Sequence, residues 1–180
     1  MRGLRHRRLV RALSAPDETK RWQAAAALIR LEDPGALRRV ERLLENGGHD
    51  EGRAAAAYVL GFSGAREIAG TLARRLADAD EPTVVRAHAA EALGHLLQHG
   101  PVLAEVRMPI VAGLRDAEAE VRFWCAFAAG VLDLQESRAH LERLRDDGTQ
   151  IEGWWTVGQE ADWALRCLDG DEDPPLPERS

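Results

Sequence analysis

The sequence predicts an all-α fold built from about five stacked helix pairs, and three observations support it. The 180 residues include only five Trp, three Phe and one Tyr while Ala is abundant, so the interior must be built from small side chains at close helix contacts. No β-branched run alternates with a period of two residues for long enough to form a sheet. A helical segment also recurs along the chain, which is typical of stacked repeat units.

The recurring segment opens at Arg21, Arg53, Arg86, Arg122 and Gly158. Its copies read RWQAAAALIRL, RAAAAYVLGFS, RAHAAEALGHL, RFWCAFAAGVL and GQEADWALRCL, and they start 32 to 36 residues apart. Ala or Cys stands three places after each opening residue, and Leu or Ala stands seven places after it. We predict that each copy forms the second helix of one pair.

A shorter amphipathic stretch precedes each copy and is predicted to form the first helix of the pair. These stretches are Leu4 to Leu13, Ala36 to Leu44, Ile68 to Leu76, Val102 to Leu114 and Ala139 to Leu144. Helix-start signals stand in the turns between the two stretches: Asp17, Asp50, Asp80 before Pro82, and Thr156 with Gln159 as a capping box. Each unit is therefore predicted to be helix, turn, helix.

Two segments, DEPTVVRAHAAEALGHL from Asp80 and DAEAEVRFWCAFAAGVL from Asp116, resemble the D-x-x-x-x-V-R-x-x-A-x-x-A-L-G signature of HEAT repeats, including the variety first named for phycobilin lyases. The resemblance covers most of residues 14 to 168 and is strongest in the third and fourth units. It implies a right-handed α-solenoid of the armadillo/HEAT-like class, with one repeat domain over residues 1–168. Residues 169–180 are acidic and rich in Pro, and they are predicted to form a disordered tail.

Some signature residues have a structural explanation. Gly61, Gly94 and Gly130 share one helical phase, where the missing side chain permits a close crossing of helices. The arginines that open four copies also share a phase and are predicted to form a ladder beside acidic residues of the turns, binding unit to unit by charge-assisted pairs. The ladder residues are Arg21, Arg53, Arg86 and Arg122, with Asp80 and Asp116.

An aromatic stripe is the candidate binding surface. The first, fifth and ninth places after each opening residue lie four apart and line one face of the second helix. Since the second helices of HEAT-like solenoids usually line the concave surface, the resemblance implies that these places face a groove. The candidate partner-binding residues are Trp22, Tyr58, Phe62, Glu91, His95, Phe123, Phe127 and Trp163, with Trp154 and Trp155 at one rim. An aromatic groove with a few charges is typical of a protein-binding hot spot, but the same rings could instead fill the core between the helix layers.

Groups that could carry chemistry have plainer interpretations. His88, Glu91 and His95 lie within two turns of one helix, but they lack a recognised ligand spacing, so a polar surface is favoured over a metal site. Cys125 and Cys167 are expected to be reduced, buried thiols without a disulfide. The sequence contains no recognised catalytic motif, and we expect no metal, no cofactor and no catalytic residue.

The charge distribution bears on the partner and the compartment. Arg2, Arg5, Arg7, Arg8 and Arg11 make the first helix basic, either as an exposed cap or as a contact for an acidic partner. A net charge of −6 and the lack of interleaved aromatic residues argue against nucleic acid. No stretch is apolar enough to span a bilayer, and the chain is expected to be cytoplasmic. The excess of Arg over Lys suggests a bacterium with a GC-rich genome.

The leading functional hypothesis is a non-catalytic HEAT-repeat scaffold or adaptor that binds a protein partner through its concave aromatic face. An alternative from the resemblance is a bilin-lyase-like or cofactor-chaperone protein, or a toxin-neutralising immunity protein. A third hypothesis is a HEAT-like nucleic-acid binder, which requires a basic concave face.

Overall fold

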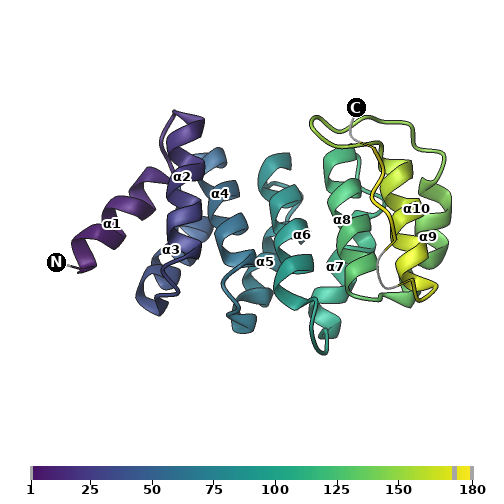
Figure 1. Ribbon diagram of the computed structural model, residues 1–180, viewed down its shortest axis with the longest axis horizontal. Coiled ribbons are helices and arrows are strands. Elements are labelled where there is room, and N and C mark those ends of the chain that lie inside the picture. Colours follow the sequence, from purple (N-terminus) through teal and green to yellow (C-terminus); the bar gives the residue numbers. More distant parts are fainter. Residues whose placement is uncertain (1, 172–173, 179–180) are drawn as a thin grey trace.

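In the computed structural model, residues 2–171 and 174–178 are described, and they form ten α-helices and two short 3-10 helices with no strand. The helices are α1 (Arg2–Ala12), α2 (Glu18–Ile29), α3 (Pro34–Asn46), α4 (Asp50–Gly61), η1 (Arg66–Ile68), α5 (Ala69–Ala77), α6 (Thr83–Leu97), α7 (Ala104–Gly113), α8 (Ala119–Val131), η2 (Gln135–Ser137), α9 (Arg138–Leu144) and α10 (Val157–Leu168). Five consecutive pairs, α1/α2 to α9/α10, follow one another in a row (Figure 1). The predicted all-α solenoid is confirmed.

The predicted helix starts are right at some turns and wrong at others. Asp17 caps α2 by accepting a hydrogen bond from the Lys20 amide at 2.9 Å, and Thr156 with Gln159 forms the capping box of α10. Asp50 is not a cap, because α4 begins at Asp50 itself. Asp80 is not a cap either, because α6 begins at Thr83 with Pro82 at its N-cap position. A short polar residue therefore marks the neighbourhood of a helix start, but it does not specify which residue caps the helix.

The second helices α2, α4, α6, α8 and α10 stand side by side as one continuous layer, and the most extensive helix contacts in the chain lie within it. Small side chains fill the space between them: Ala55, Ala56, Ala89, Ala90, Ala128 and Ala129 are fully buried. Leu60 and Leu93 of the same layer are also buried and pack toward the first helices. The core therefore lies within the second-helix layer and between it and the first helices.

The close crossings predicted at Gly61, Gly94 and Gly130 are confirmed. A Cβ atom added to Gly61 would lie 2.7 Å from the Cα atom of Ala92, and one added to Gly130 would lie 2.8 Å from the Cα atom of Ala164. The obstructing atom is backbone in both places, so neither neighbour can give way by changing a rotamer. Glycine is required here because any side chain would push two second helices apart.

Each arginine that opens a repeat copy joins its own unit to the next one. Arg122, for example, donates to the carbonyl oxygens of Asp116 and Ala117, both at 2.8 Å, and also to Asp147 Oδ2 at 2.7 Å. The carbonyls belong to the turn of its own unit, and the carboxylate belongs to the following unit. The complete set of pairs is Arg21–Glu51, Arg53–Glu81, Arg86–Asp116 and Arg122–Asp147.

The ladder corrects one predicted member. Arg53 pairs with Glu81, whereas the adjacent Asp80 is exposed and its backbone amide donates to Asp78 Oδ1 at 3.1 Å. Glu81 is buried and also accepts a hydrogen bond from Arg75. The longer side chain of Glu81 enters the space between the units, and this placement follows from the turn that ends at Pro82.

The predicted tail begins where α10 ends, at Leu168. Within residues 174–178 Pro174 is buried, so at this residue the tail contacts the repeat domain. Disorder of the rest of the tail stays a prediction.

We predict that Gly130→Ala destabilises the protein by about 1–3 kcal/mol, because its Cβ atom would collide with the backbone of α10. Urea unfolding followed by circular dichroism measures the change. Gly148→Ala is the matched control, since nothing lies within 4 Å of a Cβ atom there, and it should change stability by less than about 0.5 kcal/mol. Equal effects of the two substitutions would contradict the close crossing.

A second prediction concerns the ladder. Arg53→Ala leaves the buried carboxylate of Glu81 with one cation fewer, and removing one partner of a buried pair costs about 3–5 kcal/mol. Arg74→Ala removes an exposed ion pair with Glu45 at 3.6 Å and a hydrogen bond to Thr71 Oγ1 at 3.1 Å, while Thr71 keeps its bond to Glu41, so the cost should be under about 1 kcal/mol. Both free energies of unfolding come from denaturant titration, and a cost for Arg53→Ala no larger than that for Arg74→Ala would show that the ladder does not stabilise the stack.

Candidate partner-binding face

A chain of touching rings crosses the second-helix layer from one end to the other. Ring centroids are 5.2 Å apart for Trp22–Tyr58, 5.0 Å for Tyr58–Phe62, 4.5 Å for Phe62–His95, 5.0 Å for His95–Phe127 and 6.0 Å for Phe127–Trp163. We call these six residues the aromatic track. Its members come from α2, α4, α6, α8 and α10 in order, with Phe62 directly after the last residue of α4, so all five units contribute. Ring pairs at such distances stabilise one another and hold each ring in place.

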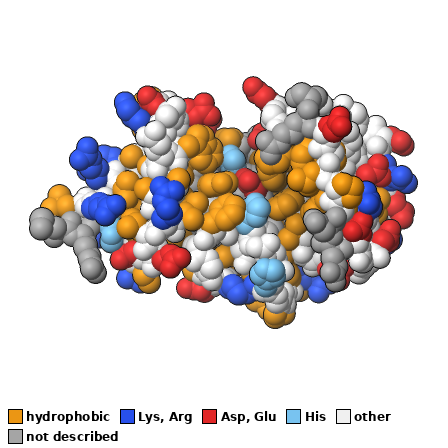
Figure 2. All heavy atoms as spheres, in the orientation of Figure 1, with side chains coloured by type: hydrophobic (Ala, Val, Ile, Leu, Met, Phe, Trp, Pro, Cys, Tyr) orange, Lys and Arg blue, Asp and Glu red, His pale blue; other side chains and the backbone are white. Residues whose placement is uncertain are grey.

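The aromatic track lies at the surface. Phe62 is 41% exposed, and the other five rings are partly exposed. Figure 2 shows hydrophobic side chains gathered across the middle of this face, with His and acidic side chains among them. The track reaches the surface because the alanines at other phases of the same helices already fill the core. For these residues the predicted placement on one helix face agrees with the structure.

One carboxylate lies at the centre of the face. Glu91 is only 7% exposed; its Oε2 atom lies 2.8 Å from His88 Nδ1, and its Oε1 atom lies 4.0 Å from His95 Nε2. The ring of His88 in turn lies 5.9 Å from that of Trp22 and 6.5 Å from that of Tyr58. The acid is therefore held by a hydrogen bond with His88, and it lies near His95 within an aromatic surrounding.

Burial sets the protonation of the neighbouring rings. It lowers the pKa of His95, and the opposing attraction of Glu91 is the smaller effect. Burial also raises the pKa of Tyr58, and the charge of Glu91 adds to that rise. His95 is therefore neutral and Tyr58 protonated near neutral pH, so neither ring adds a charge to the face.

Two residues predicted to bind the partner are core instead. Phe123 is 1% exposed and Trp155 is 3% exposed. Their rings, 6.0 Å apart, belong to a cluster that also contains Trp124 and the half-buried Trp154. The reason is the lengthened segment between α9 and α10, which turns back through a bridge of Gln150 with Thr156 and covers the start of α8. At this place the rings fill the core, as the alternative interpretation held.

The stripe pattern missed His88 and Trp124. Each stands two places after the arginine that opens its copy, outside the first, fifth and ninth places. The sequence groups His88 with Glu91 and His95 as a polar surface, and residues three apart on a helix are neighbours, which brings it to Glu91. Trp124 could not have been placed from the sequence, since its burial depends on the segment that follows α9.

A buried acid supports the end of the layer. Glu160 is almost fully buried, and its Oε2 atom accepts a hydrogen bond from Trp155 Nε1 at 2.6 Å. Burial raises the pKa of Glu160 to about 7, and the bond from Trp155 partly opposes that rise. Glu160 therefore titrates near neutral pH while it holds the Trp155 segment against α10.

The candidate chemical groups of the chain are the two cysteines and the possible metal-ligating residues. Cys125 and Cys167 are both free; Cys125 is buried as expected, but Cys167 is half-buried. Burial raises the pKa of both thiols, that of Cys167 to about 11, so both are protonated near neutral pH. Across the described ranges no group of three or more His, Cys, Asp or Glu is placed to hold a metal ion. No helix in the described part of the chain is long and apolar enough to cross a membrane.

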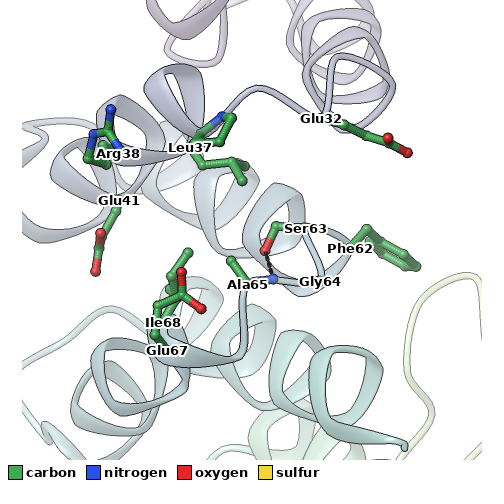
Figure 3. Close-up of a pocket in the computed structure, with 11 residues that line it drawn as sticks. Glu32, Leu37, Arg38, Glu41, Phe62, Ser63, Gly64, Ala65, Glu67 and Ile68 are labelled. Atoms are coloured by element: carbon green, nitrogen blue, oxygen red, sulfur yellow. Dashed lines mark hydrogen bonds between the residues drawn. The ribbon is translucent and has the colours of Figure 1, made fainter.

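Two hollows lie away from most of the track. One, of about 770 Å³, lies between α3 and the start of α5, and Phe62 reaches its border. Figure 3 shows that the side chains of Glu32 and Phe62 point away from those of Glu41 and Glu67, so the acidic groups do not meet at one point.

The second hollow, of about 460 Å³, lies between α1 and α3 and is lined by Arg7, Arg11, Arg39 and Arg42. Arg5, Arg7, Arg8 and Arg11 are exposed along α1, and the side chain of Arg2 lies outside the described residues. Basic side chains thus gather on α1 and α3, while Arg30, at the ninth place of the first repeat copy, is also exposed.

Solved structures share this fold. The structure of the complex of CpcE and CpcF of phycocyanin lyase from Nostoc sp. PCC7120 aligns with a TM-score of 0.71 and 17% identity over 89% of this chain and 97% of that chain. A crystal structure of an engineered protein aligns with a TM-score of 0.55 and 21% identity over 91% and 78% of the two chains. A designed armadillo repeat protein aligns with a TM-score of 0.39 and 18% identity over 89% and 98%.

No protein-family model and no curated protein matches the sequence. The expected resemblance to the phycobilin-lyase type of α-solenoid is confirmed at the level of the fold. At such low identity the likeness shows the fold alone.

We predict that Glu160→Gln changes how stability depends on pH. The folded chain keeps the Glu160 proton up to about pH 7, whereas the unfolded chain releases it near the ordinary glutamate pKa of 4.5. The folded state therefore binds more protons between these values, and this group's contribution to stability, up to about 3 kcal/mol, is lost as pH rises through that window. Gln keeps an oxygen acceptor for Trp155 and does not titrate. Unfolding of both proteins between pH 4.5 and 8 should show a fall in wild type that the variant lacks.

The control for this experiment is Glu152→Gln, because Glu152 is an exposed acid of the same segment. It should leave the pH dependence of wild type unchanged. Parallel stability curves for wild type and Glu160→Gln would show that Glu160 is ionised in the folded protein.

Proposed function

We propose that this chain is a non-catalytic scaffold or adaptor that binds a protein partner through the aromatic track. The observation that carries the proposal is the unbroken series of partly exposed rings across all five units. Aromatic side chains supply a large contact area at a small cost in conformational entropy, which explains their frequency in protein-binding hot spots. Rings already held by their neighbours lose still less freedom when a partner covers them.

Glu91, at the centre of the aromatic face, favours particular chemical groups on a partner. Glu91 is hydrogen-bonded to His88 and lies near a neutral His95 and aromatic rings, and no ring of the aromatic track carries a formal positive charge near neutral pH. A carboxylate in such surroundings favours a partner with a cationic or hydrogen-bond-donating side chain over an acidic one. The same charge repels a phosphate backbone, and the arginine-lined hollow lies between α1 and α3. The face therefore favours protein over nucleic acid.

The structural comparison adds general support. The phycocyanin lyase structure is of a complex of two proteins, CpcE and CpcF, so a solenoid of this fold is known in association with another protein. A toxin-neutralising role would be one particular case of the proposed function. The bilin-lyase-like and nucleic-acid hypotheses have no comparable observation on the aromatic face.

We predict that Phe62→Ala and Trp22→Ala each weaken partner binding at least about tenfold, because truncating an interface anchor commonly costs about 2 kcal/mol. A partner captured from an extract of the source cells is identified and purified, and its affinity for each variant is measured by calorimetry. Met108→Ala is the matched control: Met108 is 72% exposed on the first helix α7, away from the track, and its truncation should leave affinity unchanged.

A second control addresses the basic first helix. Arg7→Ala with Arg8→Ala should mainly slow association at low salt, because exposed charges steer encounter and are screened by salt. If the paired arginine substitution abolishes binding while the folded Phe62→Ala and Trp22→Ala variants keep full affinity, the partner binds the first helices and the proposed function fails.

A further inference from the structure

The last ring of the aromatic track is engaged by the chain's own C-terminal segment. Trp163 Nε1 donates a hydrogen bond to the carbonyl oxygen of Pro174 at 3.2 Å, and Pro174 is buried. In Figure 1 residues 174–178, in yellow, run back along α10, on the side of the molecule that the second helices present. The Trp163 ring also belongs to the aromatic track, because it stacks on the Phe127 ring with an angle of 17° between the ring planes.

The chemistry of this contact is that of proline-rich recognition. Residues 174–177 read PPLP, in which the first and last prolines stand three apart. Proline favours the polyproline II conformation, whose backbone forms no internal hydrogen bonds and whose carbonyls remain free to accept. Grooves that recognise such segments are lined by aromatic rings. Trp163 provides both a ring surface and an indole N–H donor to one of these carbonyls.

The turn after α10 directs the segment onto the track. Gly170 adopts a left-handed backbone conformation with φ of +90°, which reverses the chain. The reversal is fixed by two ion pairs, Arg166–Asp171 at 3.0 Å and Arg138–Asp169 at 2.8 Å. Pro174 lies only 11 residues after Trp163, so the segment meets the ring at a high effective concentration, on the order of millimolar.

We propose that the C-terminal end of the aromatic track, at Trp163 and Phe127, is a binding site for a proline-rich extended segment, and that residues 174–177 of this chain occupy it. The assignment of the site stands on the Trp163–Pro174 contact alone. Its consequence for a partner rests on the proposed function, because a partner that covers the whole track must displace this segment. A partner with a proline-rich segment of its own would fit the same place.

The test uses the full chain and a peptide of residues 171–178, DEDPPLPE. An open variant of the full chain, Pro174→Gly with Pro175→Gly and Pro177→Gly, weakens the internal occupant without altering any helix. The peptide should bind the open variant with a dissociation constant on the order of 0.1 mM by calorimetry, and it should bind wild type at least about tenfold more weakly because the tethered segment competes.

Two controls assign the contact. Trp163→Phe in the open variant keeps a ring but removes the indole donor, and it should weaken the peptide several-fold. A peptide with Pro174→Ala and Pro177→Ala should bind more weakly than DEDPPLPE, because it loses the preference for an extended backbone. In wild type the Trp163 indole proton should exchange with solvent more slowly than in the open variant, as seen by nuclear magnetic resonance, and this measurement holds whatever the peptide affinity.

Absence of peptide binding to the open variant, or equal affinity for the open variant and wild type together with equal indole exchange, would overturn the proposal. Neither outcome depends on Phe62, Trp22 or the protein partner. Failure of the proposed function is thus distinguishable, since it would leave the peptide result unchanged.

Discussion

Neighbouring second helices approach so closely that a side chain larger than that of glycine at three crossing points would meet the backbone or an aromatic ring of the next helix. Such a distance can be held only if the facing surfaces are made of Gly and Ala, and this is the composition found there. The contacts gain from dispersion over many atom pairs while burying few large side chains. The larger apolar residues of these helices must then point either toward the first helices or out to the open face. The rings of the aromatic track point out to the open face.

Small apolar contacts alone would leave one helix free to slide along its neighbour, because they have little directional preference. The arginine ladder supplies direction. Each guanidinium binds at least one carbonyl in the last part of the first helix or the turn of its own unit, and a carboxylate of the next unit, so it fixes the two units in one register. Register in turn decides whether the rings of successive helices meet. A track with centroid distances between 4.5 and 6.0 Å exists only while all five units keep that alignment.

The open face combines features that are costly to maintain in isolation. Glu91 is a largely buried acid on a surface otherwise made of rings, and His88 supplies its hydrogen bond. Partly exposed aromatic rings would also favour nonspecific association if they were left uncovered. The contact between Trp163 and Pro174 covers one end of that surface from within the chain. A face built in this way is suited to exchanging one covering segment for another.

The sequence by itself determined the helix pairs, their number and the face on which Trp22, Tyr58, Phe62, Phe127 and Trp163 stand, because the repeat and the helical period specify the phase of each residue about its own axis. Phase does not specify what covers a residue. Phe123 occupies the same place as Trp22 in its repeat, yet the segment after α9 buries Phe123 and leaves Trp22 at the surface. The choice of Glu81 over Asp80 and the contact of Pro174 with Trp163 were likewise decided by the tertiary structure. Each depends on groups from separate segments that meet only when the chain is folded, and a local period carries no information about them.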